Sequence, residues 1–89
     1  MKRQQLHITN KLGLHLRASS MLAQLSSKYT CDIWVKKNEK KVNAKSVLGL
    51  TMLAAGKGAQ IEIECTGKDE ILAIKEIVKL FQSNFYEED

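Results

Sequence analysis

Hydrophobic and polar residues alternate in four short segments of the chain, which is the pattern of half-buried β-strands. In the first segment Leu6 and Ile8 fall on one side, while Gln5, His7 and Thr9 fall on the other. The next four residues break this alternation and predict a turn. In the other segments the inward-facing residues are Cys31, Ile33 and Val35, then Val42 and Ala44, then Ile61, Ile63 and Cys65.

The second and third strands are joined by a short polar segment, so they predict a hairpin. We place its turn near Asn38, although the chain lacks the strong Asn-Gly turn signal there. Trp34 then lies on the outward face of the sheet, which we expect to face water. The fourth strand is closed by Thr66 and Gly67, both of which suit a turn.

A first amphipathic helix is predicted from the three- and four-residue spacing of apolar positions after Ala18. This helix begins close after His15. We therefore expect one apolar face toward the core and one polar face toward solvent. The apolar face carries Met21, Leu22, Leu25 and Tyr29, and the opposite face carries Ser19, Ser20, Gln24 and Lys28.

A second, short helix is predicted to start after Ser46, a suitable N-cap residue. Gly56 and Gly58 are suited to end it, since glycine tolerates the backbone conformation found after helices. The helix has more apolar residues than one narrow stripe can hold, so some of them should be exposed. These residues are Val47, Leu48, Leu50, Met52 and Leu53.

The last segment predicts a third helix with Asp69 and Glu70 in its first turn and Lys79 near its end. Acidic residues at the start and a basic residue at the end both complement the helix dipole. Its apolar face should therefore pack on the sheet. The residues of that face are Ile71, Ile74, Val78 and Phe81.

The predicted order is strand, helix, strand, strand, helix, strand, helix. It indicates an α+β fold, a βαββαβα open-faced β-sandwich in which three helices cover one face of a four-stranded, mainly antiparallel sheet. A chain of 89 residues is long enough for one core, so we expect a single domain over residues 1–89. No apolar run reaches the roughly 18 residues of a membrane helix, and we expect a cytoplasmic protein.

Charge and cysteine content bear on which partners and which cysteine chemistry the chain can have. The net charge of +4 could favour an acidic partner, but charge alone does not identify which kind. Cys31 and Cys65 lack the CxxC spacing of a metal or redox site and lie in alternating apolar segments, so we interpret them as buried free thiols. We expect no metal ion and no cofactor.

The segment Gly13-Leu14-His15-Leu16-Arg17-Ala18-Ser19 places a histidine in the turn before the first helix. Unpaired N–H groups at a helix start attract anions, and a neutral imidazole offers a nitrogen lone pair that can attack phosphorus. Arg17 could hold phosphoryl oxygens through charge-assisted hydrogen bonds. An isolated His-x-Arg pair also fits a histidine that only caps the helix beside a solvated arginine. His7 lies mid-strand on the outward face, where we expect only a surface role.

The chain contains the motif GLHLRAS and, further on, NAKSVLGLTMLAAGKG followed by IEIECTG. These motifs and the spacing between them resemble the HPr family of the bacterial phosphoenolpyruvate-dependent phosphotransferase system. The resemblance covers nearly the whole chain. It implies a phosphocarrier, not an enzyme, that is phosphorylated by Enzyme I on Nδ1 of His15, with Arg17 beside it. The carrier then donates to an enzyme II A-type component. Leu16 and Ala18 depart from the alanine and proline of many members. We expect Leu16 to affect partner choice and not chemistry, and we expect the helix start to be kept with Ala18.

The resemblance also implies a docking surface and a regulatory residue. Ser46 matches a serine that a dedicated kinase, the HPr kinase/phosphorylase, phosphorylates in some bacteria; an N-cap role alone is the alternative. We expect a monomer. The tail from Leu80 to Asp89 bears some similarity to the nitrogen-linked branch, and both the sugar and the nitrogen branch stay open. Our candidates for partner contact are Leu16, Ser20, Val47, Leu48 and Thr51, with a basic rim of Arg17, Lys45 and Lys57 in which Lys45 also contacts the partner.

Two other functional classes compete with this interpretation. Trp34 near the lysine-rich hairpin could stack a base, as in an RNA-binding module, but only one aromatic lies on that face and acidic residues share it. A small-molecule regulatory domain is the third class, with Gly13, Gly56 and Gly58 bordering a pocket. The sequence has no clear set of convergent polar residues for such a ligand.

Overall fold

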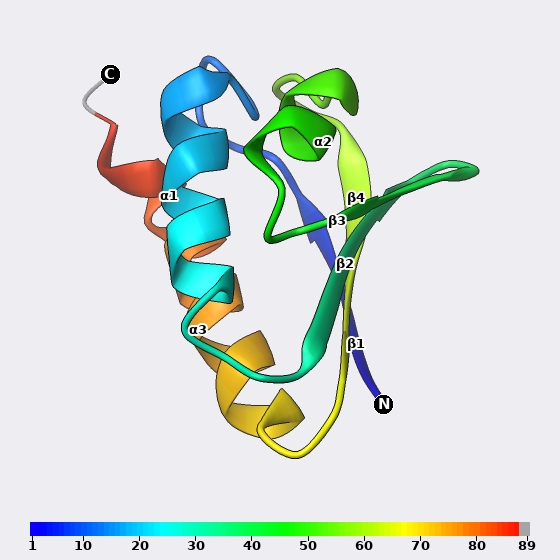
Figure 1. The fold of residues 1–89 in the computed structure, drawn as a ribbon. Coiled ribbons are helices and arrows are strands. Elements are labelled where there is room, and N and C mark those ends of the chain that lie inside the picture. Colours follow the sequence, from blue (N-terminus) through cyan, green and yellow to red (C-terminus); the bar gives the residue numbers. More distant parts are fainter. Residues whose placement is uncertain (88–89) are drawn as a thin grey trace.

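The computed structural model describes residues 1–87 and confirms the α+β fold (Figure 1). Its four strands form one antiparallel sheet in the order β1-β4-β2-β3. Helices α1 and α3 lie side by side on one face of the sheet, and α2 packs against α1 near its start. The elements are β1 (Lys2–His7), α1 (Leu16–Ser26), β2 (Asp32–Lys37), β3 (Lys40–Asn43), α2 (Val47–Met52), β4 (Gln60–Thr66), α3 (Glu70–Gln82) and a short 3₁₀ helix, η1 (Asn84–Tyr86).

The predicted alternation of the strands matches the core. Ile33, Val35, Ile61 and Ile63 are buried between the sheet and the helices, and the β2–β3 hairpin turns at Asn38, which has a positive φ of 54°. Glu88 and Asp89, the end of the tail that resembles the nitrogen-linked branch, lie outside the described residues. Within the described part, we find no helix of the length and apolarity needed to cross a membrane.

Both cysteines are free and buried, as expected, within the described residues. Burial is the main cause that raises the pKa of the Cys31 thiol to about 11 and that of Cys65 to about 12. Since the thiolate is the reactive form, both thiols are inert at neutral pH.

Helix α1 differs from its prediction on both of the predicted faces. Ser19, expected on the exposed face, is fully buried, because its hydroxyl donates a hydrogen bond to the Leu14 carbonyl at 3.1 Å and is thereby satisfied. Tyr29 does not belong to the helical face, since α1 ends at Ser26. It packs instead as a half-buried residue of the following loop.

Helix α2 begins as predicted but ends earlier. The Ser46 side chain accepts a hydrogen bond from the Gly49 N–H at 3.0 Å, which confirms the N-cap. The helix stops at Met52, and Ala54, with φ of 54°, takes the left-handed conformation that we had assigned to Gly56 and Gly58.

Helix α3 buries a different face from the predicted one. Asp69 precedes the helix rather than joining its first turn. Ile71 is exposed, and Ile74 and Val78 are only half-buried. Apolar residues lie on most sides of this helix, so spacing alone allows more than one stripe, and packing against α1 and the sheet selects among them. The buried residues are Ala73, Ile77, Leu80 and Phe81.

Candidate functional site

His15 is the N-cap residue of α1. Its backbone is extended, with φ of −75° and ψ of −179°, and its carbonyl accepts the first helical hydrogen bond, from the Ser19 N–H at 2.8 Å. Within residues 1–87, the His15 side chain makes no capping hydrogen bond to the helix. The first turn carries Arg17 and no acidic residue. The dipole and the N–H groups of this turn therefore favour an anion beside the imidazole.

The turn before His15 depends on a glycine. Gly13 has a φ of +66°, and a Cβ atom there would lie 2.5 Å from the Ala55 carbonyl oxygen. That same oxygen accepts a hydrogen bond from the Leu14 N–H at 2.9 Å. Buried Asn10 closes the turn, because its side-chain amide donates to the Gly13 carbonyl at 2.8 Å. These contacts fix the backbone that presents His15.

The His15 ring lies against the C-terminal segment. Its Nε2 atom is 2.5 Å from Oε1 of Glu87, and the side chains are 26% and 10% exposed. The Asn10 amide donates to the same oxygen at 3.1 Å. Partial burial raises the pKa of the Glu87 carboxyl, but the hydrogen bonds from His15 and Asn10, together with the smaller effects of the His15 charge and the Leu12 backbone, outweigh burial and bring the net pKa below its ordinary value.

Glu87 was missed by the sequence analysis. It lies 72 positions from His15 in an acidic tail, where a charge run is ordinarily a solvated surface. No local spacing relates the two residues. The only hint in the sequence is Asn10, in the turn before His15. Asparagine side chains often form hydrogen bonds in turns, but the residue type alone does not identify Glu87 as the partner.

Arg17 also contacts the C-terminal segment. Its Nη1 atom donates to the Phe85 carbonyl at 3.2 Å, while the side chain stays exposed. The structure therefore brings His15 and Arg17 to the same end of α1, next to residues 85–87. His7, in contrast, is exposed on β1, the edge strand at the other side of β4 from β2.

Three large apolar side chains are exposed on α1 and α2, which pack against each other (Figure 1). Leu16 is 67% exposed, Leu48 is 70% exposed, and Met52, which was not among our candidates, is 67% exposed. Large apolar side chains exposed on neighbouring elements are candidates for contact with another molecule. We call Leu16, Leu48 and Met52 the apolar patch.

The other candidate contact residues are less accessible. Val47 is half-buried and packs against the core, and Ser20 and Thr51 are also half-buried. Lys45 is half-buried and its ammonium donates to the Tyr29 carbonyl at 2.7 Å, which holds it away from free solvent. Lys57 is exposed.

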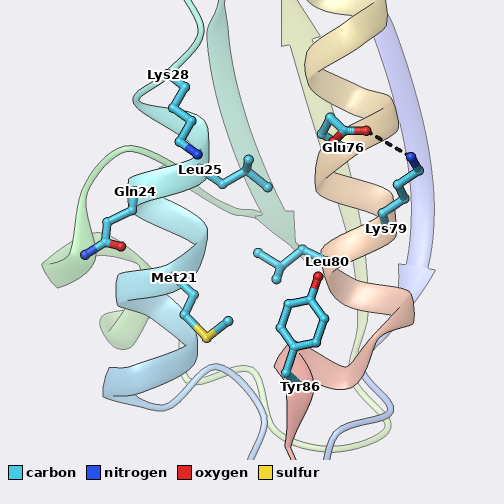
Figure 2. Close-up of a pocket in the computed structure, with 8 residues that line it drawn as sticks. All are labelled: Met21, Gln24, Leu25, Lys28, Glu76, Lys79, Leu80 and Tyr86. Carbon is cyan, nitrogen blue, oxygen red and sulfur yellow. Dashed lines mark ion pairs between the residues drawn. The ribbon is translucent and has the colours of Figure 1, made fainter.

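An open groove lies between α1 and α3 on the far side of these helices from the sheet (Figure 2). Met21 and Leu25 of α1 face Leu80 of α3, and Tyr86 lies at one end between the two helices. The Glu76 and Lys79 side chains form an ion pair at 3.2 Å on α3. The groove contains neither His15 nor Arg17 among its lining residues.

The outward sheet face does not favour base stacking. Trp34 is half-buried, and the Lys41 ammonium lies over its ring at 5.1 Å from the centroid. Lys41 also pairs with Glu64 at 3.3 Å, and Glu64 pairs in turn with Arg3 at 3.6 Å. The aromatic ring and the nearby positive charge are thus already engaged within the protein.

The fold and site define a class: an open-faced β-sandwich that carries a histidine at the start of its first helix. The family model described as "PTS HPr component phosphorylation site" matches residues 2–83. This match covers most of the chain. The protein therefore belongs to the HPr family of phosphocarrier proteins of the phosphotransferase system.

Named relatives fall in two groups of that family. Phosphocarrier protein HPr of Neisseria meningitidis is 46% identical over 87 residues and covers 98% of each chain. Phosphocarrier protein NPr of Klebsiella oxytoca is 38% identical and covers 97% of each chain. The crystal structure of HPr-C-His from Thermoanaerobacter tengcongensis is 43% identical, with a TM-score of 0.96 over all of both chains.

Proposed function

We propose that the chain accepts a phosphoryl group on His15 from phosphorylated Enzyme I and passes it to an enzyme II A-type component. The observation that carries this proposal is the imidazole of His15 at the uncapped start of α1. Membership of the phosphocarrier family supports it. The phosphoryl group is an anion, and a helix start with no side-chain cap and no acidic residue in its first turn is suited to receive one.

The two ring nitrogens of His15 have different surroundings. Nε2 contacts Glu87, whereas Nδ1 has no hydrogen-bond partner within residues 1–87. A nitrogen without a partner is available to an incoming phosphorus atom. Arg17, two residues along the helix, would hold phosphoryl oxygens once it exchanges its hydrogen bond to the Phe85 carbonyl for one to the phosphoryl group.

The test is phosphoryl acceptance with phosphoenolpyruvate and purified Enzyme I, followed by mass spectrometry. We expect wild type to gain one acid-labile phosphoryl group, and His15→Ala to gain none while it stays folded. His7→Ala is the matched control, because His7 is the other histidine and is exposed; it should be labelled like wild type. Equal labelling of His15→Ala and wild type would contradict the proposal.

The apolar patch supports a role in docking for the same cycle. Leu16 directly follows the phosphoryl-accepting residue, and Leu48 and Met52 lie on the helix packed beside it. A small apolar patch with Arg17 next to Leu16 suits a transient contact with an acidic partner. We expect the chain to bind these partners as a monomer. Because one similar structure is an HPr dimer from Thermoanaerobacter tengcongensis, that expectation stays a prediction.

We further propose that phosphorylation of Ser46 by an HPr kinase/phosphorylase would slow acceptance at His15. Ser46 precedes the helix that carries Leu48 and Met52, so a phosphate would add about two negative charges beside the apolar patch. Ser46→Asp should be labelled by Enzyme I more slowly than Ser46→Asn. Asparagine caps a helix about as well as aspartate without its charge, so equal rates would contradict this proposal.

A further inference from the structure

The C-terminal segment has an unusual backbone. Asn84, Phe85 and Tyr86 all have positive φ, at 55°, 55° and 57°, in the left-handed region. This conformation is unfavourable for residues other than glycine, and phenylalanine and tyrosine tolerate it less well than asparagine. Such strain persists only where surrounding contacts impose it, and it is concentrated at functional sites.

Side-chain contacts with α3 and with Thr9 hold the segment in place. Phe85 is completely buried, with its ring edge against Phe81 at 4.9 Å between centroids. The Thr9 hydroxyl donates to the Asn84 side chain. Figure 2 shows Tyr86 between α1 and α3, so the chain after α3 crosses toward α1. The left-handed turn redirects the chain, and Glu87 is the residue that it brings to His15.

The contact between Glu87 and His15 has a definite polarity. An ionised carboxylate can only accept hydrogen bonds. The lowered pKa of Glu87 keeps it ionised at neutral pH. The Nε2 atom must therefore be the donor, and in a neutral imidazole with its proton on Nε2 the lone pair is on Nδ1. The Asn10 amide donates to the same oxygen and fixes its position.

We propose that Glu87 is a positioning residue for phosphoryl transfer: it keeps the proton of the neutral His15 ring on Nε2 and so directs the lone pair to Nδ1. This inference rests on the proposed function. Residues 84–86 act as the strained support that brings the carboxylate to the ring. Arg17 is held to the same support through the Phe85 carbonyl, which aligns the two residues before a partner arrives.

The proton on Nε2 stays in place throughout the transfer step. The Nδ1 lone pair forms the bond to phosphorus, and the bond between phosphorus and the donor's leaving group breaks, with its electron pair leaving on the donor. The ring gains positive charge, which the Glu87 carboxylate stabilises through Nε2–H. In the onward transfer the N–P bond breaks, its electron pair returns to Nδ1, and the ring leaves as neutral imidazole.

The deciding experiment compares Glu87→Ala with Glu39→Ala, which removes an exposed carboxylate at the far hairpin. The first readout is the 15N NMR spectrum of His15 at about pH 9, where an ordinary histidine is neutral. Wild type and Glu39→Ala should show a protonated Nε2 and an unprotonated Nδ1. Glu87→Ala should show a mixture of the two tautomers. An unchanged tautomer in Glu87→Ala would overturn the proposal.

The second readout is the initial rate of phosphoryl acceptance from Enzyme I. We expect Glu87→Ala to be slower by about tenfold, the lower end of what loss of a residue that orients a functional histidine does in metal sites. A rate equal to that of Glu39→Ala would overturn the proposal. The tautomer measurement needs no Enzyme I, so it separates this inference from the proposed function, which fails if wild type is not labelled or if His15→Ala is labelled equally.

A second variant tests the position of Glu87 without replacing Glu87 itself. Phe85→Ala removes the buried anchor and should release Glu87 although the carboxylate is still present. The His15 tautomer should then shift as in Glu87→Ala. If the ring keeps its proton on Nε2 in a folded Phe85→Ala protein, the strained segment is not the support of this contact.

Discussion

Two helices of this protein begin in opposite ways. Helix α2 begins after Ser46, whose side chain accepts a hydrogen bond from the Gly49 N–H. Helix α1 begins after His15, whose side chain turns away from the helix to contact Glu87. The first arrangement satisfies a backbone donor and stabilises the helix. The second leaves the donors of α1 for an anion, so the protein gives up local stability where we propose that it binds phosphate.

The two starts also differ in what holds them. The start of α2 depends on a local contact, between Ser46 and Gly49 three residues further along the chain. The start of α1 depends on distant partners: the Ala55 carbonyl for Leu14 and the C-terminal segment for His15. A site held by distant partners responds to substitutions that leave every residue of the site in place.

The largest expected effect follows from Gly13→Ala. The added Cβ would meet the Ala55 carbonyl oxygen, and alanine would be forced to a positive φ. We expect a loss of about 3 kcal/mol in the free energy of unfolding, measured by urea denaturation. Phosphoryl acceptance by the folded fraction should also slow, because the turn presents His15.

Gly58→Ala is the matched control for this prediction. Gly58 also has a positive φ, of +89°, but no atom lies within 4 Å of the position of its Cβ. It should show the backbone penalty alone, at about 1 kcal/mol. Equal losses for the two variants would mean that the close approach of Gly13 to Ala55 does not contribute.

A smaller effect tests the two caps by exchanging serine and alanine at each. Ser46→Ala should lower the free energy of unfolding by about 1 kcal/mol relative to wild type. At the other start, His15→Ser should be more stable than His15→Ala by a similar amount, since serine can accept a hydrogen bond from the first turn of α1. Both pairs are measured by urea denaturation under the same conditions.

The His15→Ser and His15→Ala variants both lack the contact with Glu87, so they differ only in the cap of α1. If His15→Ser and His15→Ala unfold at the same urea concentration, the start of α1 does not offer free donors. The contrast between the two helices would then be wrong, even if Ser46→Ala behaves as expected.

The sequence predicts the fold well where periodicity is unambiguous. Strand alternation identified Ile33, Ile61 and Ile63 as core residues, and Ser46 was correctly placed as a cap. Prediction failed where tertiary packing decides. Ser19 is buried because the Leu14 carbonyl receives its hydroxyl, and α3 turns a different stripe to the core because several of its faces are apolar.

The candidate site divides in the same way. The place of His15 at a helix start follows from local residues, since the glycine turn and the amphipathic pattern lie within 15 positions of it. Its contact with Glu87 does not, because it depends on how α3 packs beside α1 and on a left-handed turn at Phe85. Nothing in an acidic tail distinguishes a carboxylate that folds back from one that is solvated.

The burial of the two cysteines affects which side chains of the protein can react. A thiolate is the strongest nucleophile that a chain of this composition could offer, yet Cys31 and Cys65 are buried in the core and keep their protons well above neutral pH. Electrophiles and oxidants that reach the surface therefore meet no thiolate. The chemistry of the protein can stay confined to nitrogen, independent of the redox conditions around it.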